Sequence, residues 1–200
     1  LFIAIKGDRF DGHKFIRQAI EKGAKYCAVQ KEYKAELENA GVPLIYTDDT
    51  TKFLGELAAV RRKKLSATVI ALSGSNGKTT TKDILAELLK TTFRTVSTNA
   101  NDNNHIGVPL TIFRCTPSTE MLVLEMGTNH FGEIPYSAAI GSPDISLITC
   151  IGDSHLEFLK NRKGVLQEKK AIFDAAQKNS GLIVLNIDDP YLVKLKTKYT

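Results

Sequence analysis

A glycine-rich turn leading into Gly-Lys-Thr is the segment of this 200-residue chain with the clearest chemistry. The apolar run at 69–72 precedes it and a helical pattern follows at 82–89, which predicts a strand, a loop and a helix in that order. In such a loop, backbone N–H groups and the positive end of the helix can bind phosphate oxygens. Lys78 adds a positive charge, and the Thr79 hydroxyl can bind Mg²⁺. We therefore predict a nucleoside triphosphate site formed by Gly74, Ser75, Asn76, Gly77, Lys78, Thr79 and Thr80.

This loop is shorter than the general phosphate-loop pattern. That pattern places a glycine five residues before the glycine of the Gly-Lys pair, where this chain has Leu72. The first glycine here, Gly74, precedes Gly77 by three residues. A glycine-rich turn with a chance Gly-Lys-Thr is the alternative interpretation, and the flanking strand and helix patterns weigh against it.

Three other segments place polar residues directly after expected strands, at 98–105, 125–130 and 152–157. Because ligands of parallel sheets bind at the carboxyl ends of the strands, all these segments are expected on one rim with the phosphate loop. Glu125 closes an apolar run, where a carboxylate is costly to bury without a partner. Binding Mg²⁺ directly or through water would supply that partner. Pairing with a lysine, or capping of the strand end, is the alternative.

A histidine and two asparagines complete the polar rim that the sequence predicts. His155 could bind a metal ion through a neutral imidazole, although a lone histidine is more often structural. Asn103 and Asn104 precede an expected helix, so nucleotide binding by Asn104 competes with capping of that helix.

The elements that must position these residues alternate between strands and helices. In the first part of the chain, strands are expected at 2–5, 26–29 and 44–46, and helices at 13–22, 33–39 and 50–64. Further strands are expected at 69–72, 94–97, 122–125, 145–150 and 182–185, and helices at 79–90, 104–113, 134–140 and 164–177. This pattern predicts an α/β protein: a small α/β domain at 1–66, and at 67–200 a P-loop-type domain whose mostly parallel sheet is covered by helices.

Composition restricts the class of protein. A hydrophobic content of 42% and a charged content of 24% are ordinary for a globular protein, and no apolar run is long enough to span a membrane. The three cysteines have no zinc-site spacing, which favours reduced thiols and a cytoplasmic location. The basic cluster at 61–64 is interpreted as a helix C-terminus rather than a nucleic-acid patch. Because the chain starts at Leu1 within a strand-like run, we expect its natural N-terminus to be missing.

Taken together, these segments resemble the Mur ligase family of ATP-dependent amide-forming enzymes. The family's phosphate loop, Gly-Thr-x-Gly-Lys-Thr, is short in the same way as the loop at 74–79. The resemblance extends over nearly the whole chain and includes the segments 1–7, 11–13, 103–111, 125–130, 148–157 and 186–190. It is most similar to the family members that add D-alanyl-D-alanine to a UDP-N-acetylmuramoyl tripeptide.

The resemblance implies a mechanism and a set of site residues. ATP would phosphorylate the substrate carboxylate, and the dipeptide amine would attack the acyl phosphate. Lys78 would hold the β and γ phosphates, Thr79 and Glu125 one Mg²⁺, and His155 would help to hold a second. Lys169 is the best match for the family's carbamylated lysine, with Lys170 as the alternative. Lys78, Glu125, His155 and Lys169 are thus the expected catalytic residues.

The resemblance also implies partners and missing parts. The first domain would bind the UDP end of the substrate near Lys6, Gly7, Asp11, Gly12 and His13. A third, C-terminal domain of the family would be absent, so we expect this chain alone to bind ATP weakly and not to turn over. We expect a monomer without nucleic-acid partners. A sister ligase that adds diaminopimelate or lysine, a non-catalytic nucleotide-binding module and a nucleic-acid NTPase are the alternatives, and the segment 103–109 favours the dipeptide-adding enzyme.

Overall fold

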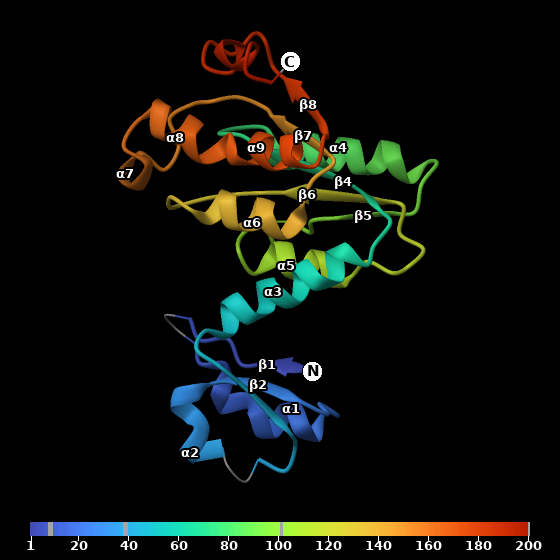
Figure 1. Cartoon of the computed structure of the whole chain (residues 1–200), viewed down its shortest axis with the longest axis vertical. Coiled ribbons are helices and arrows are strands. Elements are labelled where there is room, and N and C mark those ends of the chain that lie inside the picture. Colours follow the sequence, from blue (N-terminus) through green and yellow to red (C-terminus); the bar gives the residue numbers. More distant parts are fainter. Residues whose placement is uncertain (8–9, 38–39, 101, 200) are drawn as a thin grey trace. The chain divides into compact units, whose positions relative to one another are not determined.

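The computed structural model describes residues 1–7, 10–37, 40–100 and 102–199. The contacts between residues group the chain into two compact units, Leu1–Leu57 and Ala58–Thr200, which are described separately here (Figure 1). The sequence places the domain boundary near 66–67 instead. Across the described residues, no helix is long and apolar enough to cross a membrane.

The first unit contains a three-stranded parallel sheet in the order β1-β2-β3. The strands are β1 (Phe2–Ile3), β2 (Cys27–Gln30) and β3 (Leu44–Thr47). The connecting helices are short: a 3-10 turn at Gly12–Phe15 continues into α1 (Ile16–Glu21), and one at Lys31–Tyr33 continues into α2 (Lys34–Leu37). The last two residues of the helix expected at 33–39 lie outside the described residues.

Helix α3 (Thr50–Lys63) begins in the first unit and ends in the second. Its C-terminal arginines are used for packing within the second unit. Arg61 donates to the backbone oxygen of Cys115 at 2.7 Å, and Arg62 binds the backbone oxygen of Gly141 and the carboxylate of Asp144, each at 3.0 Å. The basic cluster is thus a helix C-terminus, as interpreted, and two of its arginines also bind groups of the second unit.

The second unit is built around five parallel strands in the order β5-β6-β4-β7-β8. They are β4 (Thr68–Ser73), β5 (Thr95–Ser97), β6 (Met121–Glu125), β7 (Ile145–Ile148) and β8 (Leu182–Leu185). The helices are α4 (Lys78–Lys90), α5 (Gly107–Phe113), α6 (Glu133–Gly141), α7 (Leu156–Leu159), α8 (Arg162–Lys169) and α9 (Ala171–Lys178). A 3-10 turn follows at Val193–Leu195.

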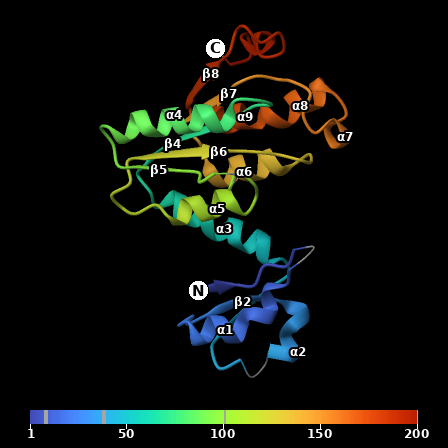
Figure 2. The same ribbon diagram turned by 180° about the vertical axis from the view of Figure 1, so that it is seen from behind.

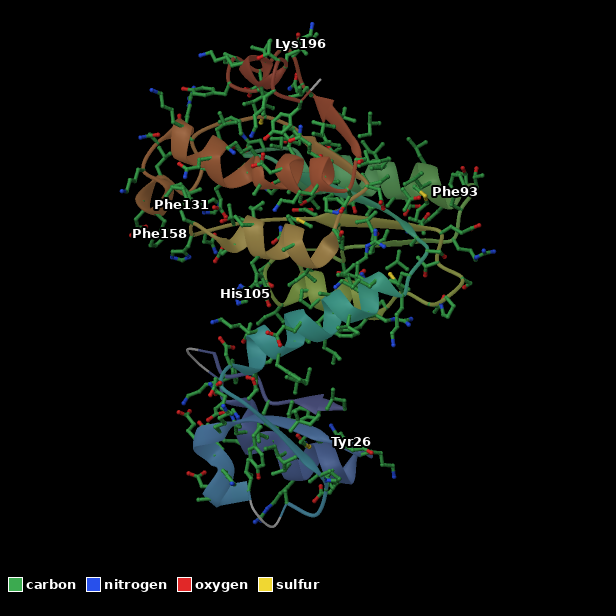
Figure 3. All side chains as sticks on the ribbon, viewed as in Figure 1. Tyr26, Phe93, His105, Phe131, Phe158 and Lys196 are labelled. Atoms are coloured by element: carbon green, nitrogen blue, oxygen red, sulfur yellow. The ribbon has the colours of Figure 1, made fainter. Side chains whose placement is uncertain are left out.

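Helices cover both faces of this sheet, as predicted. Helix α4 packs against β5 and β6 on one face, whereas α5, α6 and α9 lie on the other (Figures 1 and 2). The apolar strands supply the core, in which Val69, Leu122 and Leu124 are fully buried. Register pairs Leu72 with Glu125, so the ends of β4 and β6 lie side by side. The carboxyl ends of the strands lie on the side of the unit where Figure 3 labels Phe131 and Phe158.

Several element boundaries differ from the prediction, and three of the differences lie near the site. The helix expected at 164–177 is two helices, because the chain turns at Lys170 between α8 and α9. Helix α5 begins at Gly107 rather than 104, and β7 ends at Ile148 rather than 150. The three cysteines are free thiols, as expected.

Candidate functional site

The phosphate loop connects β4 to α4 and depends on its two glycines. Gly77 has a φ of 77° at the N-cap of α4, in the left-handed region that favours glycine. At Gly74, with a φ of 153°, an added Cβ would lie 1.8 Å from the Thr149 hydroxyl oxygen, so no side chain fits there. The Lys78 ammonium lies over the loop and donates to the backbone oxygen of Gly74 at 2.9 Å. The first turn of α4 and this lysine thus provide positive charge at one point.

The remaining loop residues attach the loop to the segment that follows β7. The Ser75 hydroxyl accepts from the backbone N–H of Gly152 at 2.8 Å and lies 3.0 Å from the Ser154 hydroxyl. The backbone oxygen of Asn76 accepts from the Thr149 hydroxyl at 2.5 Å. Thr80 is exposed in the first turn of α4. Ser75 therefore holds two strand-end loops together in this structure.

Glu125 lies at the end of β6 and is fully buried. Its Oε1 accepts from the Thr79 hydroxyl at 3.2 Å and from the Asn103 amide at 2.8 Å. Its Oε2 is buried without a hydrogen-bond partner among the described residues. A buried carboxylate oxygen that lacks a donor and lies beside a hydroxyl suits a hard cation such as Mg²⁺.

The described residues contain no group of three His, Cys, Asp or Glu side chains that could hold a metal ion by themselves. A cation beside Glu125 would therefore need oxygen ligands from elsewhere. Mg²⁺ commonly keeps several waters and binds one or two carboxylates together with substrate phosphates, which is compatible with the donors present.

A cavity of about 290 Å³ brings part of the predicted site together, although Thr79, Glu125 and the phosphate-loop residues other than Lys78 do not line it. Four of the residues that the sequence predicts line it, namely Lys78, Asn104, His155 and Lys169. Asn103, His105, Gly127, Thr128, Asn129 and Glu133 complete its wall. The strand-end segments thus converge on one rim, as the parallel sheet predicts; Asn101 of the first segment lies outside the described residues.

Lys169 is more deeply buried than Lys78, the other lysine of this cavity. Its side chain is 1% exposed, and burial together with the charge of Lys78 lowers its pKa to about 8. By contrast, Lys170 turns away and pairs with Asp174 at 2.9 Å. Lys169, rather than Lys170, therefore faces the site.

His155 lies at the start of α7 in a left-handed conformation, with a φ of 52°. Partial burial, followed by the charges of Lys169 and Lys78, lowers the pKa of its imidazole below the ordinary value. The neutral form that could bind a metal ion is thus favoured near pH 7.

Asn104 performs the capping role that the sequence offered as an alternative. Its Oδ1 accepts from the backbone N–H groups of Ile106 and Gly107 at 3.0 and 2.9 Å, and the same residue lines the cavity.

Asn103 is the residue that the sequence interpretation missed, since it was considered only as part of a helix start. Its amide binds Glu125, and an added Cβ at Gly127 would lie 2.8 Å from its side-chain oxygen. The signal was its place in a strand-end segment, although the sequence alone does not say which of two adjacent asparagines faces the acid.

Glu168, next to Lys169, supports the wall of the cavity. Its side chain is buried, and its two oxygens accept from the backbone N–H groups of Gly132 and Ile134 at 2.9 and 2.8 Å. These N–H groups belong to the start of α6. Helix α8 therefore presents its lysine to the cavity and its glutamate to the neighbouring loop.

The motif at 186–189 fixes the loop that carries His155. The Asn186 amide donates to the backbone oxygen of Thr149 at 2.7 Å, and Asp189 Oδ2 accepts from the backbone N–H of Ile151 at 2.7 Å. The other oxygen of Asp189 accepts from the N–H groups of Tyr191 and Leu192.

In the first unit, the predicted residues form a closely paired cluster. Asp11 Oδ1 lies 2.7 Å from His13 Nδ1, and Asp11 Oδ2 accepts from the Tyr33 hydroxyl at 2.6 Å. His13 is buried, and its Nε2 accepts from the backbone N–H of Gln30 at 3.0 Å, which leaves Nδ1 as the ring donor to Asp11. An added Cβ at Gly12 would lie 2.7 Å from the Ile5 backbone oxygen.

Comparison with known proteins agrees with this geometry. The Mur ligase middle domain family matches residues 72–200, and the Mur ligase family, catalytic domain, matches residues 1–62. The chain is 41% identical, over 96% of its length, to a UDP-N-acetylmuramoyl-tripeptide–D-alanyl-D-alanine ligase of Bacillus subtilis, and 38% identical, over 94%, to that of Escherichia coli. It spans 41% and 40% of the lengths of these relatives.

Solved structures give the same result. MurF from Acinetobacter baumannii superimposes with a TM-score of 0.86 at 32% identity, over 98% of this chain and 42% of that one. MurF ligase from Thermotoga maritima in complex with ADP has a TM-score of 0.83 at 34% identity, over 99% and 45%. With the phosphate loop, Glu125 and Lys169 gathered at the strand ends of a matching fold, the chain belongs to the Mur ligase family.

Proposed function

We propose that this chain is part of an ATP-dependent ligase that adds D-alanyl-D-alanine to a UDP-N-acetylmuramoyl tripeptide. The observation that carries the proposal is the cavity that unites the phosphate-loop Lys78 with the buried Lys169, beside a buried glutamate that has one unpaired oxygen. The names of the relatives supply the substrates, and the ADP complex of the Thermotoga protein supports ATP as the nucleotide.

The proposed reaction has two steps. An oxygen of the substrate carboxylate attacks the γ-phosphorus of ATP, the bond to ADP breaks, and an acyl phosphate forms. The dipeptide amine then attacks the carbonyl carbon, a C–N bond forms, phosphate leaves, and the amine loses a proton. Both steps bring anions together, so cationic groups at the rim are needed.

Different residues of the chain are proposed to bind the phosphates, to hold the metal ions and to position the loops. Lys78 and the N–H groups at the start of α4 bind and orient the β and γ phosphates. Thr79 and Glu125 would hold one Mg²⁺ through their side-chain oxygens, and His155, which lines the cavity, would help to hold a second through its imidazole. Bound Mg²⁺ would offset negative charge on the phosphoryl oxygens. Ser75 keeps the loop that carries His155 against the phosphate loop.

Lys169 is proposed to act as a carbamate. A neutral amine is needed to attack CO₂, and the lowered pKa of Lys169 makes that form accessible near neutral pH. Loss of one proton gives the neutral amine; its attack on CO₂ forms an N–C bond, breaks one C=O π bond and releases a second proton, so that a buried cation becomes an anion. An anion is the better neighbour for Lys78 and for a cation held near His155.

The remaining assignments extend this proposal to the rest of the protein. The first unit is proposed to bind the UDP end of the substrate near Lys6, Gly7, Asp11, Gly12 and His13, and a domain boundary near 66–67 stays a prediction. A cytoplasmic, monomeric enzyme is expected.

Phosphate release by the full-length protein tests the function. ATP and the UDP-linked tripeptide are supplied, and D-alanyl-D-alanine, diaminopimelate and lysine are added in turn. The proposal predicts stimulation by the dipeptide alone. Stimulation by a single amino acid would favour a sister ligase, and nucleotide binding without any turnover would favour a non-catalytic module.

A further inference from the structure

Lys82 is a buried cation for which the proposed mechanism has no role. It lies one helical turn after Lys78 in α4, and only 3% of it is exposed. Its Nζ donates to the backbone oxygen of Thr98 at 3.0 Å and lies 2.6 Å from Asp83 Oδ1 on the same helix. Because burying an ammonium is costly, a methionine would fill this volume with a smaller desolvation penalty. Filling space therefore does not account for a lysine at this position.

The partner of Lys82 belongs to the backbone that surrounds Glu125. Thr98 directly follows β5, and its hydroxyl accepts from the backbone N–H of Glu125 at 3.0 Å. The Thr98 N–H donates to the backbone oxygen of Val123 at 3.0 Å. Lys82 thus fixes the point at which β5 ends and is held against β6.

The same segment reaches Glu125 a second time, at its far end. Asn103 donates its amide to Glu125 Oε1, and its backbone oxygen accepts from the N–H of Gly127 at 2.8 Å. Glu125 is therefore held by its own backbone at Thr98 and by its side chain at Asn103. The orientation of the unpaired Oε2 depends on both ends of this segment.

We propose that Lys82 is a positioning residue for the Mg²⁺–nucleotide site, acting through Thr98 on the carboxylate of Glu125. The inference rests on the proposed function. A charge-assisted hydrogen bond to the Thr98 carbonyl is stronger than one from a neutral donor, and it fixes the strand end from which Glu125 is held. Residues behind metal ligands commonly change metal affinity or activity by about 10- to 100-fold when they are replaced.

The test measures ADP binding to the full-length protein by calorimetry across a Mg²⁺ titration. Lys82→Met is expected to raise the Mg²⁺ concentration at half-maximal effect by about 10-fold, with ADP affinity in the absence of Mg²⁺ unchanged. Lys90→Met is the matched control, because Lys90 is an exposed lysine of the same helix that pairs with Glu87 at 2.7 Å. This control is expected to leave the Mg²⁺ midpoint unchanged.

A double-mutant cycle tests the route through Thr98. Thr98→Val removes the hydroxyl that accepts from Glu125 and is expected to shift the Mg²⁺ midpoint in the same direction. Since both residues act on one carboxylate, the double variant is expected to shift little further than the larger single effect. Independent, additive shifts would overturn the proposal.

The remaining outcomes are distinguishable. A lower melting temperature for Lys82→Met with an unchanged Mg²⁺ midpoint would show a purely structural lysine and overturn the inference. If Lys82→Met does not fold, Thr98→Val carries the test, and an unchanged midpoint for it also overturns the inference. If the ADP affinity of the wild-type protein does not depend on the Mg²⁺ concentration, the proposed metal site itself is contradicted.

Discussion

In the first unit, each carboxylate oxygen of Asp11 has a partner, whereas in the second unit only one oxygen of Glu125 does among the described residues. Glu125 is the last residue of β6, and Asp11 lies in the loop that follows β1. Both were predicted to belong to binding sites. The Asp11 cluster is satisfied by its own neighbours, since His13 and Tyr33 use both of its oxygens. Buried polar groups that remain unpaired are costly, so the carboxylate of Glu125 is available for a ligand, whereas the carboxylate of Asp11 stabilises the loop near which the UDP end is proposed to bind.

The largest effect is expected when the charge of Glu125, the acid with an unpaired oxygen, is removed. Glu125→Gln in the full-length protein keeps the size of the side chain and an oxygen for Thr79 and Asn103, but removes the charge. Ligase activity is expected to fall by about 100-fold or more, because a preorganised electrostatic contact is lost. The melting temperature should not fall, since the uncompensated buried charge is removed. A strong loss of stability with activity retained would show that Glu125 belongs with Asp11 as a structural acid.

The next effect tests the buried cation of the same cavity. The ordinary pKa of a lysine, 10.5, applies to the unfolded chain, and about 8 applies to folded Lys169. Between about pH 8 and pH 10.5 the unfolded state binds more protons than the folded state, so the free energy of unfolding rises with pH. Below about pH 8, Lys169 is charged in both states, and the folded state bears the full cost of burying the ammonium. Without CO₂, Lys169→Met is expected to raise the free energy of unfolding at pH 7 by about 1–3 kcal/mol.

Chemical denaturation at pH 7 and pH 10 in CO₂-depleted buffer measures this difference, which should shrink at the higher pH. Lys170→Met is the matched control, because Lys170 is partly exposed and paired with Asp174. Its effect should be small and should not follow the same pH dependence. Equal effects of the two substitutions would contradict the distinct environments of these adjacent lysines.

The third effect concerns the satisfied cluster. Asp11→Ala removes the acceptor for His13 and Tyr33 and is expected to destabilise the first unit by about 1–3 kcal/mol, with ADP binding unchanged. The hydrogen bond from Tyr33, opposed by burial and helped by His13, holds the pKa of Asp11 well below its ordinary value of 3.8. Its contribution is therefore present at neutral pH and is lost as the pH falls below about 4. Urea unfolding at pH 7 and pH 3 measures it.

The contrast between the two regions also shows what the sequence could predict. Apolar runs predicted the strands, and the rule for parallel sheets predicted that Lys78, Glu125 and His155 share one rim. Both regions contain motifs of the same resemblance, yet the sequence does not distinguish a satisfied acid from an unsatisfied one. That difference depends on where Tyr33 and Asn103 point, which is decided by tertiary packing.

The same limitation applies to the lysines. Lys82 reads as one more polar residue of an amphipathic helix, and Lys169 and Lys170 are adjacent. Helical periodicity predicts one continuous helix across 164–177, whereas the chain turns at Lys170. Local patterns report the helix, but the contact of Lys170 with Asp174 and the burial of Lys169 are properties of the assembled unit.

Helix α8 has a consequence for how the chain can vary in length. Its start is set by Asn161, whose side chain accepts from the N–H of Gly164, and its end delivers Glu168 and Lys169 to different targets. Neighbouring residues on a helix are about 100° apart, so adding or deleting one residue after Asn161 would rotate the pair by that angle. The carboxylate would leave the α6 N–H groups and the amine would leave the cavity. The number of residues between Asn161 and Lys169 is therefore fixed by the fold. We expect this segment to accept substitutions on its exposed side but no insertion or deletion.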